Sequence, residues 1–430
     1  MIRGGIGLFA TLFSGSTAES VFGNAPSKFS PSVTFGEVGL PSDTNSSAYA
    51  AQAAYNVFSS GFGAGDTLTQ IQGALGKIKF SAPSYYSPPN NFTPPQTTEW
   101  SAEVERTLGS HDVLALSYVG NHGYNQPMSN TWSNAYLLLT NGTNKYYGTS
   151  FGGLPTAAPD PRFLTVTQVL TAGYSNYDAM TVQLRHSLKY GFQGQVGWTW
   201  SHALGDGTVY NPYNLQFGYG NQSFDVRHAV VSDLIWTEPF HFSNGILKGA
   251  LGGWTFGWKI YAFTGTPFSS SDAKINAQIN SGGGTGTTPL ATVVDSNINP
   301  ICTAVHGTST PPCFTTSQFE TYNSTTGVNT PVQSDFGSTG PGVFRGPGYF
   351  DVDTQLSKKF YIKEKSAFEI GGQVYNTFNH PSFKNPTAEV TSGNLGTATS
   401  AVAPPTSPYG SGQGAIVTGR VIVVTAKFSF

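Results

Sequence analysis

The sequence has little charge and little sulfur. Only 10% of its 430 residues are Asp, Glu, Lys or Arg, whereas an ordinary soluble protein has about 25%. The net charge is -2 and no block of Lys or Arg occurs, which excludes the basic footprint that a nucleic-acid partner requires. With 2 Cys and 3 Met, the chain also lacks the material of a helical core rich in Leu and Met.

Long apolar runs are also missing. The longest candidate, residues 135–139, is far shorter than the roughly 18 apolar residues that a spanning helix needs. If this chain lies in a membrane, it crosses as strands. Residues 1–6 lack the charged segment and apolar stretch of a secretory signal, so we expect the N-terminus to be truncated.

The residues that are present favour an all-β protein. Aromatic residues make up 13% of the chain and Gly numbers 52. The terminal segment 422–430 alternates apolar residues at even positions with Thr425, Lys427 and Ser429. Such a two-faced strand at the chain terminus is typical of an outer-membrane barrel, in which lipid-facing and lumen-facing residues alternate along every strand.

The same period of two predicts about ten strands along the chain. They cover residues 2–9, 100–104, 114–118, 180–184, 192–200, 226–236, 254–262, 350–360, 367–378 and 422–430. Their connections alternate between turns, which are short apart from 237–252, and long links at 10–97, 121–174, 204–224, 265–346 and 380–414. This order predicts an antiparallel transmembrane β-barrel with long extracellular loops, and the alternative is a soluble β-sandwich.

Six aromatic residues near predicted strand ends fit the girdles that lie at headgroup depth in a membrane barrel. They are Trp100, Tyr118, Trp200, Trp236, Trp254 and Phe430. Ordinary packing in a β-core explains any one of them equally well, so only the joint pattern favours a membrane girdle.

The two cysteines, Cys302 and Cys313, lie close together in a stretch rich in Ser, Thr and Pro. We predict a disulfide that pins a surface loop, and the alternative is a pair of unpaired thiols. A loop of this length gives a stabilisation of roughly 3 kcal/mol in the chain-entropy model. No His or second Cys pair stands at ligand spacing, so no metal site is expected.

Three groups of residues are candidates for catalytic or binding sites. Ser201 and His202 are neighbours in a strand, so they point to opposite faces and cannot form a triad with Asp206. Asp351 and Asp353 share a face, which is consistent with an acid and base pair, but we favour the lining of a wet lumen.

The third group is Asp225, Arg227 and His228. It either contacts a solute or forms a local ion pair that anchors a loop, and we favour the ion pair. The glycine-rich run 282–286 lacks the Lys and the context of a phosphate loop, so it is interpreted as a flexible loop tip.

Five separated motifs are more specific than any periodicity. In order they are SNYDAM at 175–180, WTWSHALGD at 198–206, FDVRH at 224–228, FRGPGYF at 344–350 and YNTFNHP at 375–381. Together they resemble the C-terminal half of the barrel domain in TonB-dependent, Oar-like outer-membrane transporters, and the resemblance covers residues 1–430.

The resemblance implies a barrel of about 22 strands, plugged by an N-terminal domain and driven by the inner-membrane TonB complex. We therefore expect residues 1–430 to be the C-terminal part of such a barrel in the cell outer membrane, without the plug domain, the TonB box or the signal peptide. The implied activity is energy-coupled uptake of an unknown solute, with no enzyme activity, cofactor or metal.

Two further partners follow from the resemblance: the outer-membrane lipid and the barrel assembly machinery. The machinery would recognise the terminal residues Ala426, Phe428 and Phe430 as an assembly signal. Two other functions stay open, namely an outer-membrane adhesin or passive porin, and an outer-membrane barrel hydrolase.

Overall fold

The computed structural model describes most of the chain. The described residues are 1–13, 15–24, 31–32, 40–75, 79–80, 83–89, 91, 93–137, 151–273, 287–302, 312–320, 335–363, 366–402 and 419–430. The glycine-rich run 282–286, which we interpreted as a loop tip, lies outside them.

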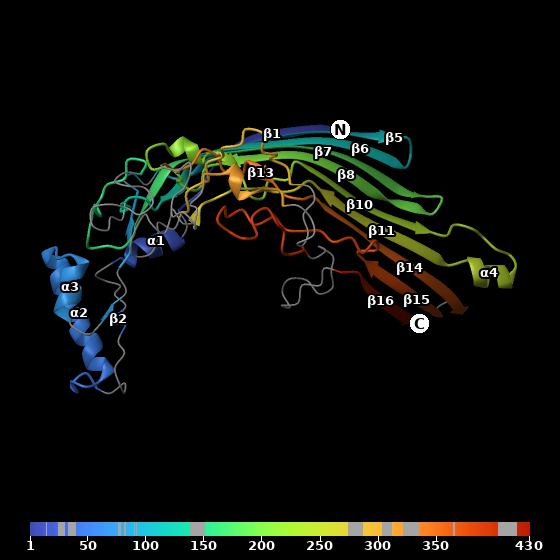
Figure 1. Ribbon diagram of the computed structural model, residues 1–430. Helices are drawn as coiled ribbons and strands as arrows, with labels where there is room; N and C mark the ends of the chain where they lie inside the picture. Colours follow the sequence, from blue (N-terminus) through green and yellow to red (C-terminus); the bar gives the residue numbers. More distant parts are fainter. Residues whose placement is uncertain are drawn as a thin grey trace.

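Ten strands pair in one curved, antiparallel sheet (Figure 1). In spatial order they are β1 (Ile2–Ala10), β5 (Gln96–Leu108), β6 (Asp112–Asn130), β7 (Val166–Lys189), β8 (Phe192–Gly205), β10 (His228–Thr237), β11 (Trp254–Phe263), β14 (Tyr349–Lys363), β15 (Ser366–Tyr375) and β16 (Val421–Ser429). Two short strands, β4 (Tyr85–Ser87) and β9 (Gly220–Asn221), join the sheet beside β7 and β8.

All ten strands predicted from the period of two are confirmed, and so is their antiparallel order. Three hairpin connections are only a few residues long, at 109–111, 190–191 and 364–365, whereas 238–253 is longer and contains helix α4 (Gly245–Leu251). Within the described residues the sheet is open, because β1 and β16 form its two edges and pair only with β5 and β15.

Apart from register shifts near Gln126, Lys189 and Lys363, the register places the even-numbered residues of these strands on the same face. Leu116 of β6, for example, pairs with Val104 of β5 and Val182 of β7, and Val182 pairs with Trp198 of β8. Most of the exposed large apolar side chains in the sheet are even-numbered. They include Ile2, Ile6, Leu8, Val104, Leu108, Leu114, Leu116, Leu184, Phe192, Val196, Phe350, Leu356, Phe360, Phe368, Ile370, Ile422, Val424 and Phe428.

The buried apolar residues lie mainly in the long links at one end of the sheet. Met128, Trp132, Phe151, Val209 and Phe336 form one cluster that joins three of these links. A second cluster contains Phe314, Phe319, Phe344, Val390 and Leu395. The molecule therefore packs a core in its loop layer and leaves the apolar face of its sheet uncovered.

Three helices lie in the link between β1 and β5, where the pattern of residues predicts no strand and we expected only a long loop. They are α1 (Gly15–Phe22), α2 (Ser47–Ala64) and α3 (Leu68–Leu75). Helix α2 begins after Ser46, whose hydroxyl accepts from the Tyr49 amide at 3.1 Å, and ends at Gly65 in the left-handed region. Among the described helices, none is both long and apolar enough to cross a membrane.

Candidate lumen-facing site

The odd-numbered face of the sheet is polar and carries paired charges. Arg3 bonds to Glu103 at 2.6 Å and Arg185 bonds to Glu105 at 2.6 Å. On the neighbouring strands β7 and β8, Gln183 donates to Gln195 at 3.0 Å and the hydroxyls of Thr181 and Thr199 are 2.9 Å apart. The alternation of the strands thus separates an apolar face from a polar one.

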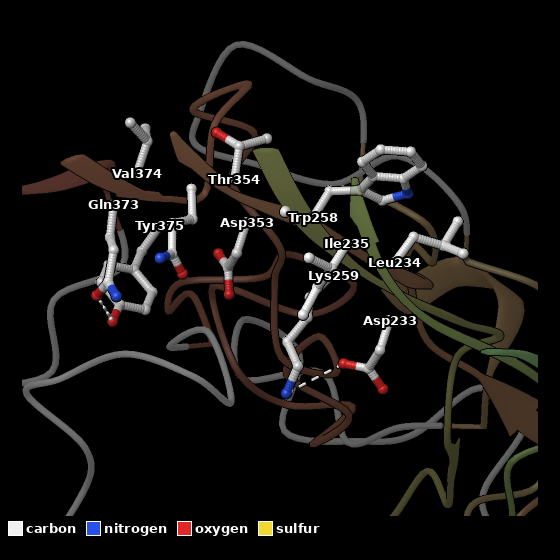
Figure 2. Close-up of a pocket in the computed structure, with 12 residues that line it drawn as sticks. Asp233, Leu234, Ile235, Trp258, Lys259, Asp353, Thr354, Gln373, Val374 and Tyr375 are labelled. Carbon is white, nitrogen blue, oxygen red and sulfur yellow. Dashed lines mark hydrogen bonds and ion pairs between the residues drawn. The ribbon is translucent and has the colours of Figure 1, made fainter. Parts of the chain in front are cut away.

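A hollow of about 380 Å³ lies on the odd face over β10, β11, β14 and β15. Figure 2 shows Asp233, Lys259, Asp353, Gln373 and Tyr375 on one side of the sheet. The Lys259 ammonium is 3.2 Å from the Asp233 carboxylate, and the Tyr375 hydroxyl donates to Gln373 at 2.9 Å. Gly257 leaves room because a Cβ there would meet only ordinary contacts.

The opposite side of the sheet at the same place is mainly apolar. Leu234, Trp258 and Val374 point away from the carboxylates in Figure 2. The hollow therefore offers hydrogen-bond donors and acceptors with two carboxylates and one ammonium, and it faces the inside of the curved wall if the apolar face meets lipid.

A buried carboxylate binds two arginines at the loop end of the sheet. The Asp225 carboxylate has no exposed surface and accepts from Arg345, from Arg227 at 3.4 Å and from the Ala203 amide at 2.7 Å. Burial alone would raise the pKa of Asp225, but the hydrogen bonds from Arg345 and Ala203 and the two guanidinium charges hold that pKa below its usual range. We call Asp225, Arg345, Arg227 and the Ala203 amide the Asp225 clamp.

The predicted local ion pair of Asp225 with Arg227 is present, but the nearer partner is Arg345. Arg345 lies in β13 (Phe344–Arg345), 120 residues further along the chain. The clamp thus joins two of the sequence motifs, FDVRH and FRGPGYF. His228 takes no part in it and instead stacks on Trp198 of the even face, with ring centroids 5.8 Å apart.

Two of the remaining motifs, YNTFNHP and WTWSHALGD, also make backbone contacts at the loop end of the sheet. The Asn376 amide donates to Asp353 at 2.9 Å, and Asn376 itself has a φ of 50°. Its side chain accepts from the His380 amide at 2.9 Å. The Asp206 carboxylate accepts from the Tyr174 amide, and burial raises the pKa of Asp206. These contacts fix where strands end and loops begin.

The catalytic candidates do not converge. Ser201 donates to the Val226 carbonyl at 2.6 Å, while His202 bonds to Asn221 at 3.0 Å on the other face. Asp351 and Asp353 share the odd face as predicted, opposite Tyr261 and Lys259 of β11. Within the described ranges, no three His, Cys, Asp or Glu side chains are grouped so that they could hold a metal ion.

The family of the chain follows from comparison with known proteins. The family described as "Outer membrane beta barrel domain" matches residues 1–409. The chain belongs to this outer membrane β-barrel family. Its place is therefore the outer membrane, with the even-numbered apolar face toward lipid and the odd-numbered face toward the lumen.

Solved structures with a similar arrangement include three outer-membrane receptors or transporters. The ferric-catecholate import receptor Fiu of E. coli K12 has 11% identity and a TM-score of 0.36, over 79% of this chain and 29% of that one. The FrpB iron transporter of Neisseria meningitidis has 10% identity and a TM-score of 0.35, over 80% of this chain and 33% of that one. The outer membrane transporter YddB of Escherichia coli has 10% identity and a TM-score of 0.37, over 84% of this chain and 36% of that one.

The present chain thus spans about a third of the length of these three proteins. Likeness at this level does not bear on function. No curated protein sequence matches the chain.

In this outer membrane β-barrel chain, the predicted girdle residues share the lipid-facing side. Trp100, Tyr118 and Trp200 lie toward the loop end, where Tyr118 pairs with Met180 and Met180 with Trp200. Trp236 and Trp254 lie at the turn end. Phe430 follows β16, whose Ala426 and Phe428 face the same side. The membrane girdle and the assembly signal remain predictions.

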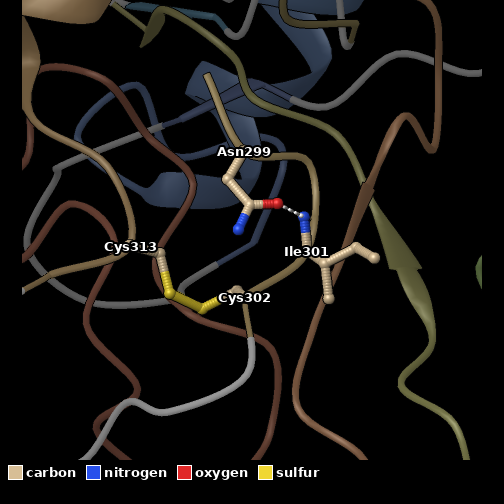
Figure 3. Close-up of a disulfide and its surroundings, with 4 residues drawn as sticks. All are labelled: Asn299, Ile301, Cys302 and Cys313. Carbon is tan, nitrogen blue, oxygen red and sulfur yellow. Dashed lines mark hydrogen bonds between the residues drawn. A yellow bond between two sulfur atoms is a disulfide. The ribbon is translucent and has the colours of Figure 1, made fainter. Parts of the chain in front are cut away.

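A disulfide joins Cys302 to Cys313 in the loop layer, with Cα atoms 5.5 Å apart (Figure 3). The Cys302 amide donates to the Arg345 carbonyl at 2.8 Å, and the Cys313 amide donates to the Gly396 carbonyl at 3.0 Å. Cys302 is buried beside Ala398. The disulfide therefore closes a loop within the β11–β14 connection, and the hydrogen bonds of its two cysteines join that loop to Arg345 of β13 and to Gly396 of the β15–β16 connection.

Two functional candidates were not predicted from the sequence. The first is Arg345, which lies in a motif but had no assigned role, because Asp225 was expected to pair only with its neighbour Arg227. The second is Lys358. Lys358 of β14 lies on the lipid-facing side, where the alternation predicts an apolar residue, and it is only 7% exposed. The break in that alternation was the one signal in the sequence that marked Lys358.

Proposed function

We propose that the chain forms part of the wall of a TonB-dependent, Oar-like transporter that takes up a solute across the outer membrane with energy coupling. One observation supports this proposal most: the sheet has an apolar face for lipid and a polar face for the lumen, and a packed layer of loops lies at one end of it. An uptake channel needs these three parts. The partners of this function are outer-membrane lipid, the barrel assembly machinery, the TonB complex acting through a plug domain, and the solute.

In this proposal the loop layer captures the solute and the odd-numbered face guides it. Arg3, Arg185 and Lys259 each have a carboxylate partner, so the wall offers hydrogen bonds without a strong field of one sign. A channel of this kind lets a polar solute exchange partners along the wall. The chain itself performs no bond chemistry.

The decisive experiment measures solute accumulation by cells that carry the full-length protein in the outer membrane. A labelled panel of oligosaccharides, ferric chelates and copper chelates is supplied to hosts with and without TonB. We expect accumulation of one class in the host with TonB and its loss in the host without TonB. Equal accumulation in both hosts contradicts energy coupling.

A second measurement separates transport from passive permeation. Proteoliposomes that contain the full-length protein are exposed to arabinose, and swelling is followed by light scattering. A plugged transporter gives no more swelling than empty liposomes, whereas swelling would support a passive porin. Adhesion of cells to surfaces without any accumulation would support an adhesin, and hydrolysis of lipid or peptide by the refolded protein would support a barrel hydrolase.

A further inference from the structure

Helix α4 lies in the long connection between β10 and β11, at the turn end of the sheet and opposite to α1–α3 (Figure 1). All of its residues are exposed. Ile246 is 83% exposed, Leu247 46% and Leu251 51%. Large apolar side chains on a short surface helix are costly to hydrate, so these side chains favour an apolar surface that covers them.

The apolar residues of α4 form one stripe. Ile246 and Ala250 are four residues apart, as are Leu247 and Leu251, and at 3.6 residues per turn these two pairs lie side by side. Lys248 and Gly249 occupy the other side of the helix. The helix is therefore amphipathic, with a single positive charge opposite its apolar stripe.

The helix is attached to the lipid-facing side of the sheet by two even-numbered residues. Lys358 of β14 donates to the Ala250 carbonyl at 2.8 Å and to the Gly252 carbonyl at 3.0 Å. The indole of Trp254 donates to the Ala250 carbonyl at 3.1 Å, and the Lys358 ammonium lies 4.5 Å from the centroid of a Trp254 ring. A positive charge at the carbonyl end of a helix is also favourable for its dipole.

This attachment explains a charged residue on the apolar side of the sheet. The Lys358 ammonium satisfies two carbonyls at the end of α4 and stacks on an aromatic ring. It thereby ties the connection to the same side of the sheet that meets lipid. The end of the apolar stripe at Ala250 is thus held beside Trp254 of the lipid-facing side. Trp236 and Phe192 lie at the same end of the sheet, with ring centroids 6.2 Å apart.

We propose that α4 is an interfacial anchor whose occupant is the phospholipid leaflet at the turn end of the sheet. Ile246, Leu247 and Leu251 insert at the boundary of headgroups and acyl chains, and Lys248 stays among the headgroups. Trp236 and Trp254 mark the same depth, which is where Trp concentrates in membrane proteins. This anchor fixes the depth of the β10–β11 hairpin and is independent of the solute that the protein handles.

The test uses two matched pairs of single-cysteine variants of the full-length protein. The native cysteines are joined in the disulfide, so an added cysteine is selectively labelled with an environment-sensitive fluorophore. The first pair is Leu247→Cys and Lys248→Cys. The second is Ile246→Cys and Gly249→Cys, and a side chain at Gly249 meets no atom within 4 Å. Circular dichroism confirms that each variant keeps its sheet.

Each labelled protein is placed in vesicles of phosphatidylethanolamine and phosphatidylglycerol. Nitroxide lipids labelled near the headgroup should quench the fluorophore at positions 247 and 246 several-fold more than at positions 248 and 249. Iodide in the water should show the opposite order. Equal access of iodide to both members of each pair would overturn the proposal, because no protein partner is present in these vesicles to cover the helix.

Discussion

At the scale of single residues, the buried carboxylate of Asp225 is the group on which the contacts at the loop end of the sheet depend most. The variant Asp225→Ala removes the carboxylate that accepts from Arg345 and from the Ala203 amide. Removing one partner of a buried ion pair costs roughly 3 kcal/mol. We expect a loss of that size in the free energy of unfolding, measured with guanidinium in lipid vesicles, and faster hydrogen exchange at the Ala203 amide.

The matched control is Arg227→Gln. Arg227 is 3.4 Å from Asp225 and its side chain is 29% exposed, so the loss should be about 1 kcal/mol or less. If both variants lose the same free energy, the contact with Arg227 accounts for the whole effect of Asp225, and the contact with Arg345 adds no stability.

The pH dependence of the clamp has a definite sign. Because the pKa of Asp225 is lowered in the folded protein, its contribution is fully present above the unfolded value of about 3.9. The contribution is lost as the pH falls through the lower folded pKa. Protection of the Ala203 amide, corrected for intrinsic exchange, should be constant from neutral pH to about pH 4 and then decrease. Asp225→Ala should show no such step.

Gly120 allows a second prediction at this scale, because the Trp100 indole lies directly over it. A Cβ at Gly120 would come within 2.5 Å of that ring. Gly120→Ala should therefore displace Trp100 and cost about 1–3 kcal/mol of stability. At Gly372, also on the lipid-facing side, the nearest atom would be 3.8 Å away, so Gly372→Ala should leave the unfolding midpoint unchanged. Similar losses in both variants would show that Trp100 does not occupy this position.

At the scale of elements, the register makes adjacent residues of one strand experience opposite surroundings. Leu116 of β6 faces lipid between Val104 and Val182, whereas Ser117 faces the lumen between Glu103 and Thr181. Leu116→Arg should cost about 2–4 kcal/mol in vesicles, as expected for Arg on the lipid face near the midplane. Ser117→Arg should cost much less, and the reverse order in urea titrations would contradict the assigned faces.

The disulfide acts on the loop layer and not on the sheet. In Cys302→Ser/Cys313→Ser, loss of the cross-link should destabilise this layer by about 3 kcal/mol in the chain-entropy model. We expect faster proteolysis of the loops, with strand amides equally protected. In the native protein, reduction should add two hydrogens to the mass of the peptides that contain Cys302 and Cys313. An unchanged mass would mean that the thiols are not joined.

The strands could be predicted from the sequence because alternation is a local signal. Each of the ten shows its own period of two, and short turns fix which neighbours pair. The helices could not be predicted in the same way. Helix α2 has capping residues at Ser46 and Gly65, but its buried face depends on contacts with Ile71, Leu75 and the distant Phe163.

The site was predictable only in part for the same reason. The polar and apolar faces follow from the alternation, so the shared odd-numbered face of Asp351 and Asp353 could be predicted. Their burial, at 2% and 8% exposed, could not, and it does not fit the wet lumen lining that we favoured. The pairing of Asp225 with Arg345 spans 120 residues, and no periodicity within either motif indicates it. Contacts between distant loops depend on the assembled sheet.

At the scale of the whole molecule, the gathering of long connections at one end predicts the orientation of the protein. Outer-membrane barrels have short turns on the periplasmic side and long loops outside. Gly207 lies in the connection after β8, where an added side chain would meet no atom within 4 Å. Ser110 is exposed in the turn between β5 and β6. These two positions report on opposite sides of the membrane.

We expect a membrane-impermeant maleimide to label Gly207→Cys in intact cells and Ser110→Cys only after the outer membrane is permeabilised. Electrophoresis of the labelled full-length protein measures both reactions, and the native protein serves as the control because Cys302 and Cys313 are joined. Labelling of Ser110→Cys in intact cells would place the short turns outside. In that case the loop layer with its Asp225 clamp would face the periplasm, and it could not be the first surface that a solute meets.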